Sequence, residues 1–266
     1  MNHRSVYRIV ATLTGAALLA VVASGALAQR VNGGTVLGAP RPVGQGTGRS
    51  FITFDDRGRP TAIGVSLSEG ALSGLPTEPP AGAPPEFEYV LPLPKEAAVA
   101  GYTHVTLNWN PQGHPPPGVY TVPHFDFHFY LIAPEERARI TATGQDLEKT
   151  RRKPAPEFVP AGYILPPGTE VPRMGAHMIN PAADEFQKKP LTKTFLYGSY
   201  DGRLIFVEPM VTKAFLESKP NVTESIGLPE AYPRPGYYPT RYSVKYDPAS
   251  QEVRVSLEGL TQREGR

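Results

Sequence analysis

Proline and glycine recur along the whole chain and leave little room for long regular elements. The 266 residues include 31 prolines and 26 glycines, which are spread through the sequence. These residues mark turns and the ends of strands and helices. Long helical periodicity is absent from the sequence between them. The pattern favours a mostly β fold, an antiparallel β-sandwich or barrel-like domain with a few short helices.

The segment 123–132 carries the clearest strand pattern, because apolar and polar residues alternate strictly along it. One face of this predicted strand is formed by Phe125, Phe127, Phe129 and Leu131. The other face is formed by His124, Asp126, His128 and Tyr130. The apolar face predicts ordinary core, although it also suits a site for an apolar ligand inside a barrel. The polar face is where we look for chemistry.

Two hairpins are predicted around short turns. One joins strands at 50–54 and 61–68, and the other joins 193–200 to 203–209 through Asp201-Gly202. Asp-Gly suits the type I′ turn of a tight hairpin. Residues 204–207 are apolar on both faces, and Glu208 is expected on the face of Leu204 and Phe206. That strand is therefore either central in a sheet or covered by another subunit.

The remaining elements are predicted to be short. Further strands are expected at 87–93, 103–109, 242–246 and 252–257. Short helices are expected at 68–73, from 133 to before Gly144, and at 211–217. Residues 151–192 are rich in proline and are expected to be irregular.

Residues 1–28 have the three-part pattern of a secretory signal peptide. A basic start with Arg4 and Arg8 precedes an apolar stretch at 9–22, and Ala26-Leu27-Ala28 places small residues at a cleavage site. We expect cleavage after Ala28. The alternative is a membrane anchor, which is disfavoured because the apolar stretch is short and no charged stop follows it. The chain is therefore expected to be exported to the periplasm or the extracellular space.

The mature chain is expected to form one domain. Residues 29–48 are expected to form a Gly/Pro-rich arm or loosely held edge, 49–260 a single mostly-β domain, and 261–266 a polar tail. Without Arg4 and Arg8 the chain has 25 basic and 25 acidic residues. A neutral chain with no basic patch predicts no nucleic-acid partner, and no stable membrane span is expected after cleavage.

Histidines are concentrated in the middle third of the mature chain. They are His104, His114, His124, His128 and His177. The chain has no cysteine, so any metal ion must be held by imidazoles and carboxylates. Strand residues two apart lie about 6.6 Å from each other and those four apart about 13 Å. Asp126 with one flanking histidine is therefore the natural chelating pair.

Further ligands must come from other segments. His177 lies in a predicted loop beside Gly175, and Glu208 lies on an apolar strand where a buried carboxylate needs a partner. The candidate ligands are His124, Asp126, His128, His177 and Glu208. This donor set suits Zn²⁺, Fe²⁺ or Mn²⁺. Whether His104 or His114 joins them stays open; a hairpin centred near His114 would place His104 opposite His124.

Four segments together carry a resemblance. They are 51–60 with Ile63-Gly-Val, 123–130, 174–178, and Tyr197-Gly-Ser-Tyr-Asp-Gly continuing to Met210. In these segments the chain resembles a family of exported bacterial proteins catalogued as a domain of unknown function, over roughly residues 45 to 220. The resemblance implies a mostly β domain and secretion. It implies no activity and no functional residues.

Two functions of different kinds follow from these observations. The first is an exported metal-binding protein, with a metal-dependent enzyme that acts on a small-molecule ligand as one form of it. The second is a non-catalytic envelope or extracellular protein that forms a homo-oligomer or binds a partner. In the second case the His/Asp cluster is a structural hydrogen-bond network, or an ordinary polar face.

Overall fold

The computed structural model describes residues 33–266 except 80 and 83. The predicted signal peptide and the start of the predicted arm lie outside the described residues. Cleavage after Ala28 and export therefore stay predictions.

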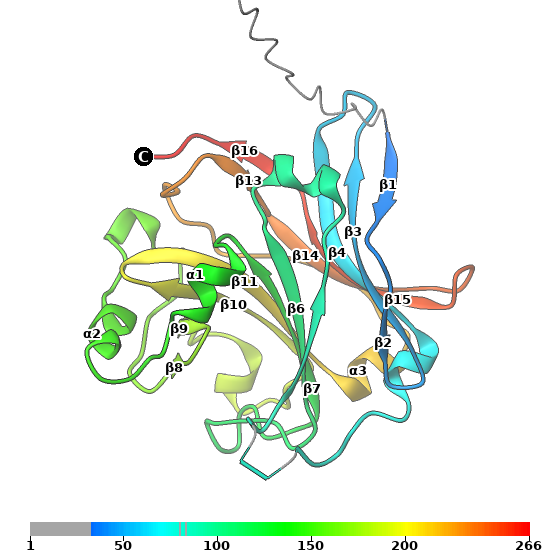
Figure 1. Ribbon diagram of the computed structural model, residues 1–266, viewed down its shortest axis with the longest axis horizontal. Coiled ribbons are helices and arrows are strands. Elements are labelled where there is room, and N and C mark those ends of the chain that lie inside the picture. The colour runs from blue at the N-terminus through cyan, green and yellow to red at the C-terminus, as the bar shows by residue number, and fades with distance from the viewer. Residues whose placement is uncertain (1–32, 80, 83) are drawn as a thin grey trace, which may run out of the picture.

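Most of the strands belong to two antiparallel sheets of seven strands each (Figure 1). Sheet A has the order β1-β3-β4-β15-β14-β12, with β2 paired to β3. Its strands are β1 (Gly34–Leu37), β2 (Arg41–Val43), β3 (Gly46–Phe54), β4 (Pro60–Ser68), β12 (Asn221–Ser225), β14 (Arg241–Asp247) and β15 (Glu252–Glu258).

Sheet B has the order β5-β6-β7-β11-β10-β9-β8. Its strands are β5 (Phe87–Leu91), β6 (His104–Asn110), β7 (His124–Tyr130), β8 (Glu170–Val171), β9 (Gly175–Met178), β10 (Lys193–Tyr200) and β11 (Arg203–Thr212). Strand β7 lies between β6 and β11 and contributes side chains to both faces of the sheet.

The other elements are short. A small two-stranded sheet pairs β13 (Gly236–Tyr238) with β16 (Thr261–Arg263). The α-helices are α1 (Pro134–Ala138), α2 (Asp146–Arg151) and α3 (Lys213–Glu217). The 3-10 turns are η1 (Glu69–Leu72), η2 (Lys95–Ala100), η3 (Pro156–Phe158) and η4 (Asp184–Gln187). Within the described ranges, none of the helices has the length and apolarity to cross a membrane.

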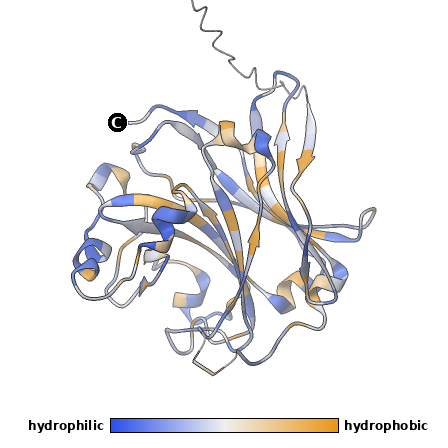
Figure 2. Cartoon of the chain, in the orientation of Figure 1, coloured by the Kyte–Doolittle hydropathy of each residue, from blue (hydrophilic) through white to orange (hydrophobic). Residues whose placement is uncertain are grey.

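The core lies between the two sheets. Phe125, Phe127 and Phe129 on β7 are fully buried and pack in one cluster with apolar residues of sheet A such as Ile63 and Val255. Figure 2 shows apolar residues alternating with polar ones along the strands. The prediction of a mostly β antiparallel sandwich with a few short helices is confirmed, and the phenylalanine face of β7 is core.

Helices α1 and α2 lie on the opposite side of sheet B from β1 to β4 (Figure 1). A second apolar cluster forms on this side from Tyr130, Ile140, Ile205 and Phe206, among others. The face of sheet B that points away from sheet A is therefore also covered.

Strand β11 is central in sheet B, between β7 and β10. This position explains its two apolar faces without another subunit. The pairing of β10 with β11 shifts between Gly198 and Ser199, so Ile205 has no partner in the register. Leu204 consequently faces the core, whereas Phe206 and Glu208 face away from it. The expectation that Glu208 shares a face with Leu204 was wrong because of this bulge.

Other local expectations also differ from the structure. Residues 34–43 contain strands β1 and β2, which pair with β3, and residues 261–263 of the predicted tail form β16. The helix that begins after Ala133 already ends at Ala138. His177 lies on strand β9 of sheet B and not in a loop. The short strands among these segments gain backbone partners from other strands, which the sequence pattern of each segment alone does not reveal.

The predicted register of the β6–β7 hairpin was also wrong. His104 pairs with Tyr130, and Asn110 is the residue opposite His124. The connection between the strands runs from 111 to 123, so His114 lies near its start and not at its centre.

Candidate metal centre

The outer face of sheet B is polar and yet buried. Its rows from β6 and β7 consist of His104, Thr106, Asn108, Asn110, His124, Asp126, His128 and Tyr130, each at most 6% exposed. Buried polar groups are costly unless they have partners. The partners of these side chains therefore decide what the face can do.

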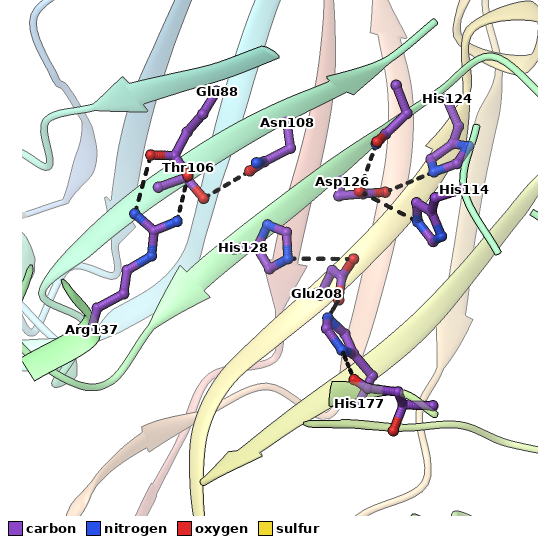
Figure 3. A network of polar contacts seen from close by, with 12 residues as sticks. Glu88, Thr106, Asn108, His114, His124, Asp126, His128, Arg137, His177 and Glu208 are labelled. Carbon is purple, nitrogen blue, oxygen red and sulfur yellow. Dashed lines mark hydrogen bonds and ion pairs between the residues drawn. The ribbon is translucent and has the colours of Figure 1, made fainter. Parts of the chain in front are cut away.

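One group of ligand atoms surrounds Asp126. His124 Nε2 lies 3.2 Å from Asp126 Oδ1, and His114 Nε2 lies 3.8 Å from Oδ2 (Figure 3). His114 comes from the 111–123 connection, and its ring meets that of His124 edge to face with centroids 4.8 Å apart. Asn110 Nδ2 donates to Asp126 Oδ2 at 2.7 Å and so fixes the carboxylate.

A second group surrounds Glu208 and joins three strands. His128 Nε2 of β7 lies 3.6 Å from Glu208 Oε1 of β11, and His177 Nε2 of β9 lies 3.5 Å from Oε2 (Figure 3). Strand order explains the meeting, because β7, β11, β10 and β9 are consecutive neighbours in sheet B. We call these two sets the Asp126 group and the Glu208 group.

Backbone carbonyls fix the orientation of three of the four imidazoles. Nδ1 of His114, His124 and His177 lies 2.8, 2.7 and 3.0 Å from the carbonyl oxygens of Pro115, Val122 and Thr169. A carbonyl only accepts hydrogen bonds, so each Nδ1 carries a proton and each Nε2 faces a carboxylate, where it offers a lone pair to a metal ion once it is deprotonated. In metalloproteins, a histidine that binds metal through one ring nitrogen commonly donates a hydrogen bond from the other nitrogen in this way.

Several ligand atoms lack hydrogen-bond partners among the described residues. They are His124 Nε2, Asp126 Oδ1, both ring nitrogens of His128, and Glu208 Oε2. Their separations of 3.2–3.8 Å match two ligands on one tetrahedral ion, which lie about 3.3 Å apart for bonds of about 2.0 Å. In each group the three ligand atoms lie within 4.8 Å of one another. Both groups therefore fit a metal ion.

Burial sets the protonation of the Glu208 group. Burial lowers the pKa of His128 to about 3, against the opposing charge of Asp126, and it also lowers the pKa of His177. Burial, together with the charges of Asp126 and Glu86, raises the pKa of Glu208 well above its usual range. These shifts favour the uncharged form of each side chain, and a bound cation would instead stabilise the carboxylate.

The Asp126 group is instead an ion pair. Burial disfavours the charged forms of His124 and Asp126, but the attraction between their opposite charges outweighs the effect of burial. It raises the pKa of His124 and lowers that of Asp126. A cation would take the place of the imidazolium proton.

A glycine and a phenylalanine hold the two imidazoles of the Glu208 group. The Phe206 ring stands edge to face against His128 and His177, with centroids 4.9 and 5.3 Å apart. Gly198 lies opposite Phe206 on one side and His177 on the other. A Cβ on Gly198 would overlap the Phe206 ring, so glycine is required where this ring packs.

Gly198→Ala is therefore expected to destabilise the protein by about 1–3 kcal/mol, the cost of overpacking. The displaced Phe206 ring should also weaken metal binding at the Glu208 group while the Asp126 group is unaffected. Chemical denaturation and metal titration measure the two effects. Gly236→Ala is the matched control, because its Cβ would have 3.5 Å to the nearest atom. Equal behaviour of the two variants would contradict the role of Gly198.

A charged network borders the centre on the β5 side. Arg137 of α1 pairs with Glu88 through both terminal nitrogens, and Arg173 lies 3.0 Å from the same carboxylate. Glu86 lies 4.0 Å from Arg173, and burial with the charge of Asp126 raises the pKa of Glu86 to about 7. None of these charged residues belongs to either ligand group.

The structure brings all five candidate ligands to one sheet face but divides them. His124 and Asp126 belong to one group, and His128, His177 and Glu208 to the other. His114 completes the first group. His104 remains outside both, because its ring stacks on Tyr130 with centroids 4.5 Å apart and its Nδ1 contacts Thr103 Oγ1.

Sequence reasoning missed the supporting residues. Asn110, Gly198 and Phe206 carry no metal-ligand signature, and their roles depend on which strands pair. Only the register of the β6–β7 hairpin could have revealed that Asn110 contacts Asp126, and the sequence did not determine this register.

Comparison with known proteins gives one family match. A family model described as TTHB210-like, hypothetical protein TTHB210, matches residues 55–109. This segment runs from the β3–β4 turn into β6 and includes none of the ligands of either group. The match is consistent with an uncharacterised family, over a shorter stretch than the resemblance suggests. No curated protein and no solved structure matches the chain.

Proposed function

We propose that this is an exported protein that binds divalent transition-metal ions at the Asp126 and Glu208 groups. The observation that carries the proposal is the orientation of the imidazoles. Three of them donate from Nδ1 to a backbone carbonyl and direct Nε2 toward a buried carboxylate. A hydrogen-bond network would satisfy the buried atoms of the centre, whereas both ring nitrogens of His128 and Glu208 Oε2 have no hydrogen bond within the described part of the chain.

The donor set favours Zn²⁺, Fe²⁺ or Mn²⁺. Each group offers two imidazoles and one carboxylate, and thiolates are excluded because the chain has no cysteine. Three protein ligands leave at least one coordination position open, as in catalytic sites. An ion there polarises a bound oxygen or activates water. This supports a metal-dependent reaction on a small molecule as the activity to test.

Burial of the ligands favours a second candidate, a structural role. Of the six ligand side chains only His114, at 28%, and His177, at 13%, are appreciably exposed. Two cavities, one beside Tyr102 and one beside Glu185, are lined by residues outside both groups. In this candidate the ions stabilise sheet B of a non-catalytic envelope or extracellular protein. A homo-oligomer stays a prediction that light scattering tests.

Elemental analysis of the purified protein tests metal binding. We expect two ions per chain, one for each group. Asp126→Ala should lose the first ion and His177→Ala the second, since each variant removes a ligand from one group only. Circular dichroism shows whether the variants remain folded. A metal-free wild-type chain that stays metal-free after incubation with zinc, iron and manganese would refute the proposal.

A further inference from the structure

His128 differs from the other three histidines of the centre. Its Nδ1, like its Nε2, is fully buried and has no hydrogen-bond partner among the residues described. When Nε2 binds an ion, Nδ1 carries a proton and must donate to an acceptor. The other three imidazoles use a backbone carbonyl for this, so His128 requires an acceptor that the described chain does not supply.

Three further buried donors, from Tyr130, Arg137 and Asn108, have no hydrogen-bond partner among the described residues. Tyr130 follows on the same face of β7, and its ring lies 5.8 Å from that of His128 and nearly parallel to it. Its hydroxyl has no hydrogen-bond partner within the described ranges. The Arg137 guanidinium lies 4.8 Å from the centre of the Tyr130 ring, and its terminal nitrogens bind Glu88. Its Nε has no hydrogen-bond partner in the described part of the chain.

Asn108 supplies the last of these donors. Its Oδ1 accepts from Thr106 Oγ1 at 3.0 Å, which leaves Nδ2 without a hydrogen bond in the described structure. Thr106 is the residue opposite His128 in the β6–β7 register. In Figure 3, Asn108 and Arg137 lie on the side of His128 away from Glu208 and His177. The four donors therefore come from β6, β7 and α1, and His128, Tyr130 and Arg137 follow one another through ring contacts.

The charge of a loaded centre favours an anion at this place. Each group has one carboxylate and two imidazoles that bind metal in the neutral form. A divalent ion thus leaves one excess positive charge in each group. The neighbouring network does not remove it, because Arg137 and Arg173 match the charges of Glu86 and Glu88. Asp126 and His128 lie two residues apart on β7, about 6.6 Å, so the two excess charges are close and buried. Uncompensated buried charge is costly.

We propose that the donors of His128, Tyr130, Arg137 and Asn108 form a binding site for a small oxyanion, a carboxylate or phosphate group, behind the Glu208 group. This site rests on the proposed metal binding. A carboxylate offers about four lone-pair positions and can accept from all four donors, whereas a water molecule has two lone pairs. The site gives the small-molecule ligand a chemical class.

Isothermal titration of the zinc-loaded full chain with acetate and with phosphate tests the site. We expect saturable binding of at least one of these anions. The anion that binds more tightly shows whether the site prefers a carboxylate or a phosphate group. Tyr130→Phe should keep both zinc ions but weaken the anion about 10-fold, the loss of one hydrogen bond to a charged group. Tyr163→Phe is the matched control, because that buried hydroxyl donates to Phe195 O on the core side.

The outcomes separate the two proposals. A zinc-loaded chain that binds neither anion, or a Tyr130→Phe variant with unchanged anion affinity, overturns the oxyanion site alone and leaves water as the partner of His128. A chain that holds no zinc in elemental analysis overturns metal binding and the oxyanion site together. Nitrogen chemical shifts of His128 give an independent readout, since Nδ1 should shift on anion binding in the wild-type protein.

Discussion

Replacement of Glu208 by glutamine is expected to remove one of two bound ions without unfolding the protein. Glu208 is the sole carboxylate of its group and contacts both imidazoles. Loss of a residue that only hydrogen-bonds to a metal ligand already lowers the metal affinity about 10- to 100-fold. Loss of the ligand itself should therefore lower the metal affinity more than about 100-fold. Glutamine keeps the shape, and burial already favours the uncharged form of Glu208 by raising its pKa.

Metal titration followed by elemental analysis measures this effect. The matched control is Glu185→Gln, because Glu185 is also a buried acid with a raised pKa but lies in neither group. Glu185→Gln should retain both ions. Full metal content in Glu208→Gln would show that the Glu208 group is not a metal site.

Phe127→Ala is expected to destabilise the protein by about 3–5 kcal/mol, the usual cost of a cavity left by a core phenylalanine. Phe127 is fully buried between the two sheets, and the neighbouring strands β6 and β11 restrain sheet B from closing the cavity. Denaturant unfolding measures the change. Metal content at low denaturant should stay at the wild-type value, because the ligands lie on the other face of β7.

A surface variant provides the comparison for Phe127→Ala. Val90 lies on the edge strand β5 and is 51% exposed, so Val90→Ala should change the free energy of unfolding by less than about 0.5 kcal/mol. A Phe127→Ala variant as stable as Val90→Ala would mean that the two sheets do not pack as described.

The fold class was predictable because neighbouring residues alone determine its clearest signals. These are the alternation of polar and apolar residues in 123–132 and the Asp201-Gly202 turn. Strand β7 and the β10–β11 hairpin appear where the sequence places them. Strands β1, β2, β9 and β16 were not recognised. They are three or four residues long, and backbone pairing with another strand stabilises them, which the pattern of each segment alone does not record.

The candidate site was predictable in its residues and not in its grouping. Strand spacing correctly pairs Asp126 with one neighbouring histidine and separates His124 from His128. The division into two groups depends on the order β7-β11-β10-β9 and on the bulge at Ile205, which directs Glu208 away from the core. The entry of His114 depends on how the 111–123 connection folds back, and spacing alone does not determine this.

The two faces of β7 also determine which changes in chain length the protein tolerates. An inserted or deleted residue within 124–130 would exchange the faces beyond it, so phenylalanines would enter the centre and imidazoles the core. Both folding and metal binding would fail in one step. In the 111–123 connection, by contrast, a length change spares the sheet and alters only the reach of His114. Homologous chains should therefore vary in length there and keep β7 constant.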